Sequence, residues 1–188
     1  MALRDILFGR KQLKDASPER LFALSTAQVT LDVELGLKPA GAAAVCFKPL
    51  SAGTFAAAER DLGELLDAFA LDSGSEVSRQ TDEFGFTWLV VRDQQLEDLV
   101  TTVHLVSSEL ISKGFGPQLL AAVFRFDGGD RPIYFVYAYK RGAFYPFVPT
   151  DGENRDNARE LELKAKLEDE LPIEQDLTRW FALFDLPL

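Results

Sequence analysis

The chain has 188 residues, of which 47% are hydrophobic and 27% are charged, a composition typical of a single globular domain. The net charge of −10 argues against a nucleic-acid-binding surface, because contacts to phosphates need clustered lysines and arginines. The single cysteine, Cys46, excludes an intramolecular disulfide and leaves too few soft ligands for a structural zinc site, so we expect neither a metal nor a cofactor.

The first residues differ in charge from the rest of the chain. Residues 1–14 carry a net charge of +3, and residues 1–15 are predicted to form a short cationic helix ahead of a single domain over residues 16–188. The alternatives for this helix are docking on its own domain and contact with an anionic membrane surface. The residues expected to face the membrane are Leu3, Ile6, Leu7, Arg10 and Lys11.

Neither a secretory signal nor a run of about 20 apolar residues is present. We therefore expect a protein of the reducing cytoplasm, with at most peripheral contact at the inner face of the membrane.

Capping and helix-breaking residues place the first elements of the domain. Ser17 and Pro18 are typical of a helix start, and this helix is predicted to run through Leu24. A second helix is expected from Thr26, with three apolar residues on one face, Val29, Val33 and Leu37. The next elements are predicted to be a strand over 42–48, a helix over 55–69, and strands over 76–81 and 84–92.

The second half of the chain contains the clearest helix. Asp93 is predicted to cap it, and its apolar residues recur with a period of about 3.6 residues: Leu96, Leu99, Val100, Val103, Val106, Leu110 and Ile111. Strands are predicted over 119–126 and 133–139 around an Asp-Gly-Gly-Asp turn at 127–130, and a short strand over 144–148. A charged helix over 154–170 and an apolar tail follow. The apolar side of this helix is predicted to be Ala158, Leu161, Ala165 and Leu167.

This order of elements predicts an α+β fold of a single domain. Hairpins dominate the strand connections, so we expect a mainly antiparallel sheet with helices packed on one face. The strand–helix–strand stretches also permit a parallel strand pair.

A catalytic site is the most specific function that the residue types allow. Cys46 and the single histidine, His104, could form a nucleophile and base beside a pocket, in a small-molecule-binding module or a hydrolase. The competing interpretation is a buried structural cysteine and a histidine on a helix surface. The chain contains none of the common phosphate-loop, metalloprotease or nucleophile-elbow motifs, and we expect no catalytic residue.

Aromatic and cationic residues gather in two segments that predict a partner-binding patch. The first lies at a predicted strand-to-strand turn and contributes Lys140, Arg141, Phe144 and Tyr145; the second lies near the C-terminus and contributes Arg179 and Trp180. Aromatic and arginine side chains are enriched in the energetic centres of protein interfaces. The alternative is a hairpin whose aromatic residues enter the core while the cations face water.

Several strings along the chain resemble the PspA-associated protein B family (PspAB). They include residues 99–102 and 114–120, the segment 139–147, residues 155–157, and the late segments 171–174 and 179–181; residues 21–24 and 44–47 are also similar. The resemblance implies a small cytoplasmic companion of phage shock protein A, a coiled-coil protein that assembles on damaged membranes. It carries over no catalytic residue.

Three functional hypotheses follow. The first is a non-enzymatic adaptor of the envelope-stress response that binds a PspA-like coiled-coil partner. Residues 151–188 carry a net charge of −6, which favours contact with a basic helix. The second is the module with a pocket near Cys46 and His104. The third is a scaffold similar to secretion chaperones, which predicts a dimer with an exposed apolar helix face. The sequence leaves the oligomeric state open.

Overall fold

The computed structural model describes residues 17–48, 60, 63–64 and 74–188. The predicted helix over residues 1–15, with its membrane-facing residues Leu3, Ile6, Leu7, Arg10 and Lys11, lies outside these residues. The predicted helix over 55–69 also lies outside them, apart from residues 60 and 63–64.

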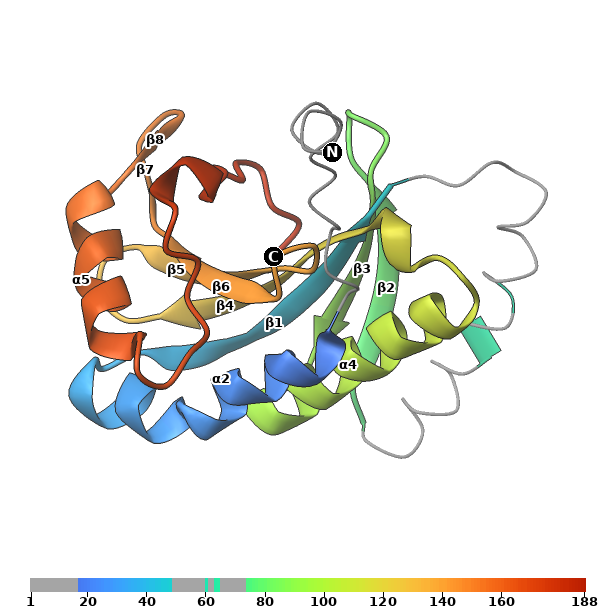
Figure 1. The fold of residues 1–188 in the computed structure, drawn as a ribbon, viewed down its shortest axis with the longest axis horizontal. Coiled ribbons are helices and arrows are strands. Elements are labelled where there is room, and N and C mark those ends of the chain that lie inside the picture. Colours follow the sequence, from blue (N-terminus) through green and yellow to red (C-terminus); the bar gives the residue numbers. More distant parts are fainter. Residues whose placement is uncertain (1–16, 49–59, 61–62, 65–73) are drawn as a thin grey trace, which may run out of the picture.

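Six strands form one antiparallel sheet in the order β2-β3-β1-β4-β5-β6 (Figure 1). Their bounds are β1 Lys38–Phe47, β2 Glu76–Thr81, β3 Thr87–Arg92, β4 Leu119–Asp127, β5 Pro132–Ala138 and β6 Ala143–Phe147. Two further short strands, β7 Pro149–Thr150 and β8 Asn154–Arg155, form a separate hairpin. The predicted α+β class and antiparallel sheet are confirmed.

One face of the sheet carries the main helices. The long helix α4, Leu96–Ser112, packs on β1, and the N-terminal helical segment packs against α4. That segment consists of the 3-10 turn η1 (Pro18–Leu21), the helix α2 (Phe22–Thr26) and the π-helical turn η2 (Thr30–Glu34). The apolar stripe predicted for the long helix is confirmed, because six of its seven residues are buried and Ile111 is half-buried.

Hydrogen bonds identify which strand residues face the helices. The Tyr137 hydroxyl donates to the Ser17 carbonyl oxygen (2.6 Å), and the Tyr139 hydroxyl is hydrogen-bonded to Ser107 of α4. Because side chains alternate along a strand, Tyr134 of β5 and Tyr145 of β6 face the other side. That side carries the C-terminal tail, whose Phe184 ring contacts the Phe147 ring at 5.5 Å.

The edge of the sheet at β6 is closed by the segment that follows the helix α5 (Asn157–Leu167). The Phe144 N–H donates to the Pro172 carbonyl oxygen (2.7 Å), and the Glu174 N–H donates to the Phe144 carbonyl oxygen (2.8 Å). These two bonds form a single parallel bridge between Phe144 and Ile173. The outward backbone groups of Phe144 are thereby bonded within the chain and are not open to a strand from another chain.

Several predicted elements have different bounds in the structure. The strand predicted over 42–48 is β1, which begins earlier, at Lys38. The N-cap of the long helix is Gln95 and not Asp93, whose carboxylate accepts the Gln95 N–H. The strand predicted to start at residue 84 begins at Thr87, because the Asp82 carboxylate accepts hydrogen bonds from the backbone N–H groups of Phe84 and Phe86 and bends the chain there. The helix predicted over 154–170 begins at Asn157, because residues 154–155 pair in the β7–β8 hairpin and the Asp156 carboxylate caps the Arg159 N–H.

The apolar faces of two shorter helices also differ from the prediction. Of the four residues predicted for the apolar side of α5 only Leu167 is buried, and Glu160 and Leu163 are buried instead. In the N-terminal helical segment Val29 and Val33 are exposed, and Leu37 is buried after the helical turns end. In short helices, therefore, the spacing of apolar residues in the sequence does not by itself identify the face that packs on the rest of the domain.

Candidate partner-binding surface

The turn between β5 and β6 presents the two adjacent cations of the predicted patch. The N–H groups of Arg141 and Gly142 both donate to the Ala138 carbonyl oxygen at 2.9 Å. Gly142 has a φ of 65°, a backbone conformation that favours glycine. The turn leaves Lys140 half-buried and Arg141 exposed. It is held to the N-terminal helical segment by Arg20, whose Nη1 donates to the Gly142 carbonyl oxygen (3.1 Å).

The third cation of the predicted patch, Arg179, is half-buried and lies in a short 3-10 turn, η4 (Leu177–Arg179). Its Nε is 2.9 Å from the Asp176 carboxylate. Hydrogen bonds from the hydroxyl and the N–H of Thr178 lower the pKa of Asp176, and the positive charges of Arg179 and Arg141 lower it further. The backbone bonds between Phe144 and the segment 172–174 bring the start of β6, which follows the β5–β6 turn, beside the chain that leads into η4.

The aromatic residues of the predicted patch do not share this exposure. Phe144 is 0% exposed, Tyr145 3% and Trp180 7%, and the Tyr145 and Trp180 rings stack with centroids 6.0 Å apart. These three side chains belong to the core, so a partner cannot reach them on the folded surface. Two apolar side chains of the tail that the prediction did not include are exposed instead: Leu177 is 48% exposed and Phe181 67%.

We call the set Lys140, Arg141, Leu177, Arg179 and Phe181 the turn–tail surface. The Tyr145 hydroxyl donates to the Phe181 carbonyl oxygen (3.1 Å), and the Trp180 indole N–H donates to the Glu174 carbonyl oxygen (2.9 Å). These bonds fix the backbone around residue 180. The Trp180 side chain therefore points inward and its neighbour Phe181 points to solvent. A pre-ordered surface of this kind loses little conformational entropy when it binds.

A buried ion pair between Arg155 and Glu160 holds the C-terminal tail in place. The Arg155 Nε lies 3.0 and 2.9 Å from the two carboxylate oxygens of Glu160, and its Nη1 donates to the Trp180 carbonyl oxygen (2.7 Å). Glu160 also accepts the Val148 N–H (2.9 Å) and is 2% exposed. Burial raises the pKa of Glu160, and its hydrogen bonds from Arg155 and Val148 act in the opposite direction. The Arg155 guanidinium lies 5.3 Å from the centre of the Phe147 ring, where the two attract each other.

Cys46 and His104 do not form the nucleophile pair considered above. Val45 is in register with Ala122 of β4, and Ala122 with Tyr137 of β5, so Val45 shares the helix-covered face and Cys46 faces the other way. His104 lies on α4, 4.8 Å from the Phe22 ring and 3.5 Å from the Ser108 hydroxyl. The sheet thus separates the two side chains. Burial, and to a lesser degree the charge of Asp82, raises the pKa of the Cys46 thiol to about 12.

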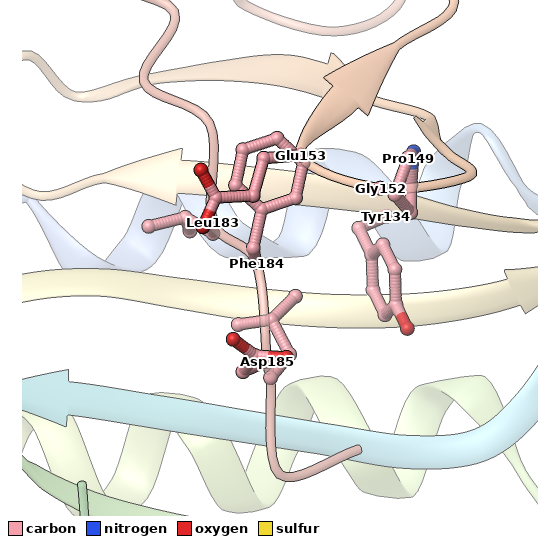
Figure 2. Close-up of a pocket in the computed structure, with 8 residues that line it drawn as sticks. Tyr134, Pro149, Gly152, Glu153, Leu183, Phe184 and Asp185 are labelled. Atoms are coloured by element: carbon pink, nitrogen blue, oxygen red, sulfur yellow. The ribbon is translucent and has the colours of Figure 1, made fainter. Parts of the chain in front are cut away.

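A cavity of about 430 Å³ lies between the β7–β8 hairpin and the tail. Figure 2 shows that its lining comes from three segments: Tyr134 of β5, Pro149, Gly152 and Glu153 of the hairpin, and residues 183–186 of the tail. The cavity is separate from Cys46 and His104, so it does not supply the pocket expected beside them. Within the described residues, no group of three or more metal-ligating side chains is found and no helix is long and apolar enough to cross a membrane.

The chain matches the model of one protein family over all of its residues. The family model for PspA associated protein B (PspAB) matches residues 1–188. The chain belongs to the PspAB family. The match confirms the resemblance seen in the separate strings of sequence, and the family name indicates association with PspA. No curated protein and no solved structure matches this chain.

Proposed function

We propose that this PspAB protein is a non-enzymatic adaptor that binds a PspA-like coiled-coil protein through the turn–tail surface. The observation that carries the proposal is the exposure of Phe181 and Leu177 beside Arg141 and Arg179 in a chain that matches the PspAB family over its full length. In this proposal the chain acts in the cytoplasm, in the envelope-stress response, where its partner assembles at the inner face of the membrane.

The residue types of the surface suit a protein interface. Large aromatic and arginine side chains contribute most of the binding free energy at interface centres, because they bury much area and pair with charged groups. The aromatic and arginine side chains here are Phe181, Arg141 and Arg179. The acidic C-terminal region around them has a net charge of −6 over residues 151–188. This charge favours a partner that carries basic residues and increases its rate of association.

The test is co-purification of the tagged full-length chain with the PspA-type protein from its native host in mild detergent. The double variant R141A/F181A removes one exposed cation and one exposed aromatic ring without touching the core. The matched control is R92A/F84A, which removes the same two residue types from the β2–β3 hairpin, where Arg92 at the end of β3 is exposed and Phe84 in the turn is 76% exposed.

We expect R141A/F181A to weaken the affinity for the partner by about tenfold or more, since each residue of this kind contributes about 1–2 kcal/mol at an interface centre. The control should retain the wild-type affinity. Recovery of equal amounts of partner with both variants would remove the turn–tail surface from the proposal. Failure of the wild-type chain to recover any PspA-type protein would reject the adaptor function itself.

A further inference from the structure

The outer face of the N-terminal helical segment exposes a row of apolar side chains. Phe22 is 39% exposed, Val29 72% and Val33 77%. With the exposed Thr26 between them, these residues are spaced by four, three and four positions. The segment that carries them packs beside α4 on the helix-covered side of the sheet (Figure 1). We call this row the helix stripe.

The inner face of the same segment is fully used by the domain. Leu24, Ala27 and Leu31 are each 0% exposed and belong to the core. The segment is therefore fixed in place mainly by its inner residues. Phe22 also contacts the His104 ring of α4, whereas Val29 and Val33 are not required to attach the segment. Single exposed apolar residues are common on protein surfaces, whereas a row of neighbouring ones marks a surface that another molecule covers.

The spacing of the helix stripe indicates the shape of that molecule. Alternating steps of three and four residues form the seam along which two α-helices pack their side chains into each other. The Leu35 N–H donates to the Thr30 carbonyl oxygen (3.2 Å), which closes a wider π-helical turn at this point. Such turns inside a helix occur frequently at functional sites. Val33 lies within this turn and is exposed.

The charges beside the stripe indicate the chemistry of the partner. Asp32 and Glu34 are exposed next to Val33. On the other side, the Thr30 hydroxyl donates to the Glu170 carboxylate at 2.6 Å, which places a further negative charge beside the seam. A second copy of this chain would bring the same carboxylates against them, and like charges that face each other across an interface are unfavourable. A helix flanked by lysines or arginines is complementary.

We propose that the helix stripe is a docking site for an amphipathic α-helix of another protein, with apolar residues at three- and four-residue spacing and basic residues on both flanks. This site is distinct from the turn–tail surface and goes beyond the proposed function, because it does not depend on the identity of the partner. Phe22, Val29 and Val33 contact the apolar residues of the incoming helix, and Asp32 and Glu170 pair with its cations.

The experiment uses the full chain and a labelled synthetic helix of about four heptads, with leucine at the two seam positions and lysine at the flanking positions. A second peptide carries glutamate in place of each lysine. Binding is followed by fluorescence anisotropy. The test variant is V29D/V33D. The matched control is Q28D/Q94D, which adds the same charge at two exposed positions outside the stripe.

We expect saturable one-to-one binding of the lysine peptide and no binding of the glutamate peptide. V29D/V33D should raise the Kd by about tenfold or more, even though its added negative charge favours a basic peptide. Q28D/Q94D should leave the Kd within about twofold of the wild type. Both variants should keep the wild-type circular dichroism spectrum and Tm, because the substituted side chains are outside the core.

Four outcomes would overturn the proposal. These are absence of binding to the lysine peptide, equal binding of the two peptides, equal weakening by the two variants, and a wild-type dimer that V29D/V33D converts to monomers. The last result would make a second copy the occupant of the stripe. Binding of the wild type, but not of V29D/V33D, to vesicles of anionic lipid without binding to the peptide would assign the stripe to a membrane surface. None of these assays contains a PspA-type protein, so their failure is separable from failure of the adaptor function.

Discussion

The Arg155–Glu160 pair shows how single residues decide the position of the C-terminal tail. Arg155 joins three parts of the chain: the carboxylate of Glu160 on α5, the carbonyl oxygen of Trp180 in the tail, and the ring of Phe147 on β6. Glu160 in turn accepts the Val148 N–H. Because every partner is buried or half-buried, none of these interactions is replaced by water if one side chain is removed.

The first prediction concerns Glu160. The variant E160A leaves the Arg155 guanidinium and the Val148 N–H without their acceptor inside the protein, and we expect a loss of about 3–5 kcal/mol in the free energy of unfolding. E162A removes a carboxylate from the same helix that pairs with Arg159 at 2.8 Å but is exposed, so it should cost less than about 1 kcal/mol. Urea unfolding followed by circular dichroism measures both. Similar losses for the two variants would mean that burial of the pair has no energetic consequence.

At the scale of elements, the turn between β2 and β3 depends on one side chain. One Asp82 carboxylate oxygen accepts the N–H groups of Phe84 and Phe86, and the other accepts the indole N–H of Trp88 at 2.8 Å. The turn thereby sets where β3 begins and fixes the Trp88 ring. Aspartate is favoured in turns because its short side chain bonds backbone groups a few residues ahead.

The second prediction is that D82A destabilises the domain by about 2 kcal/mol or more, because it removes three hydrogen bonds to a charged acceptor. E83A, at the exposed neighbouring position in the same turn, should change the free energy of unfolding by less than about 0.5 kcal/mol. Chemical denaturation with tryptophan fluorescence as the signal measures the difference. A D82A protein with the stability of E83A would show that the turn forms without the carboxylate.

At the scale of the whole molecule, the tyrosines report on the integrity of the sheet. The chain has four tyrosines, two on each face, and all four are buried: Tyr134, Tyr137, Tyr139 and Tyr145. Burial raises the pKa of each one above the usual value of 10.0, in Tyr137 to about 12. The folded state therefore holds these hydroxyls in the neutral form at a pH where the unfolded chain would release their protons.

The third prediction is a stability that decreases in alkaline solution. A group whose pKa is raised by folding stabilises the protein fully below its unfolded pKa, and this contribution is lost as the pH rises through the folded pKa. For Tyr137 the window is pH 10 to about 12, and the other three tyrosines act in the same direction. We expect little tyrosinate absorbance near pH 10, followed by a joint rise in tyrosinate and loss of circular dichroism at higher pH. Titration of one or more tyrosines near pH 10 with the spectrum of the fold unchanged would contradict the buried arrangement.

Local patterns in the sequence were sufficient for most of the fold. The Asp-Gly-Gly-Asp turn, the period of the long helix and the alternation in the strands each depend on neighbours close in the chain, and these features appear in the described residues. The family could also be identified from short strings, since family resemblance is a property of the sequence itself. The single cysteine likewise needed no structure to exclude an intramolecular disulfide.

Only the tertiary structure decided which side chains face a partner. Trp180 and Phe181 are adjacent, aromatic and alike in sequence, yet the stacking on Tyr145 buries the first and the backbone bonds turn the second outward. Val29 and Val33 have the spacing of a core face, but the core is filled by Leu24, Ala27 and Leu31 from the opposite side of the same helical turns. Exposure depends on contacts between residues far apart in the chain, and no local pattern contains that information.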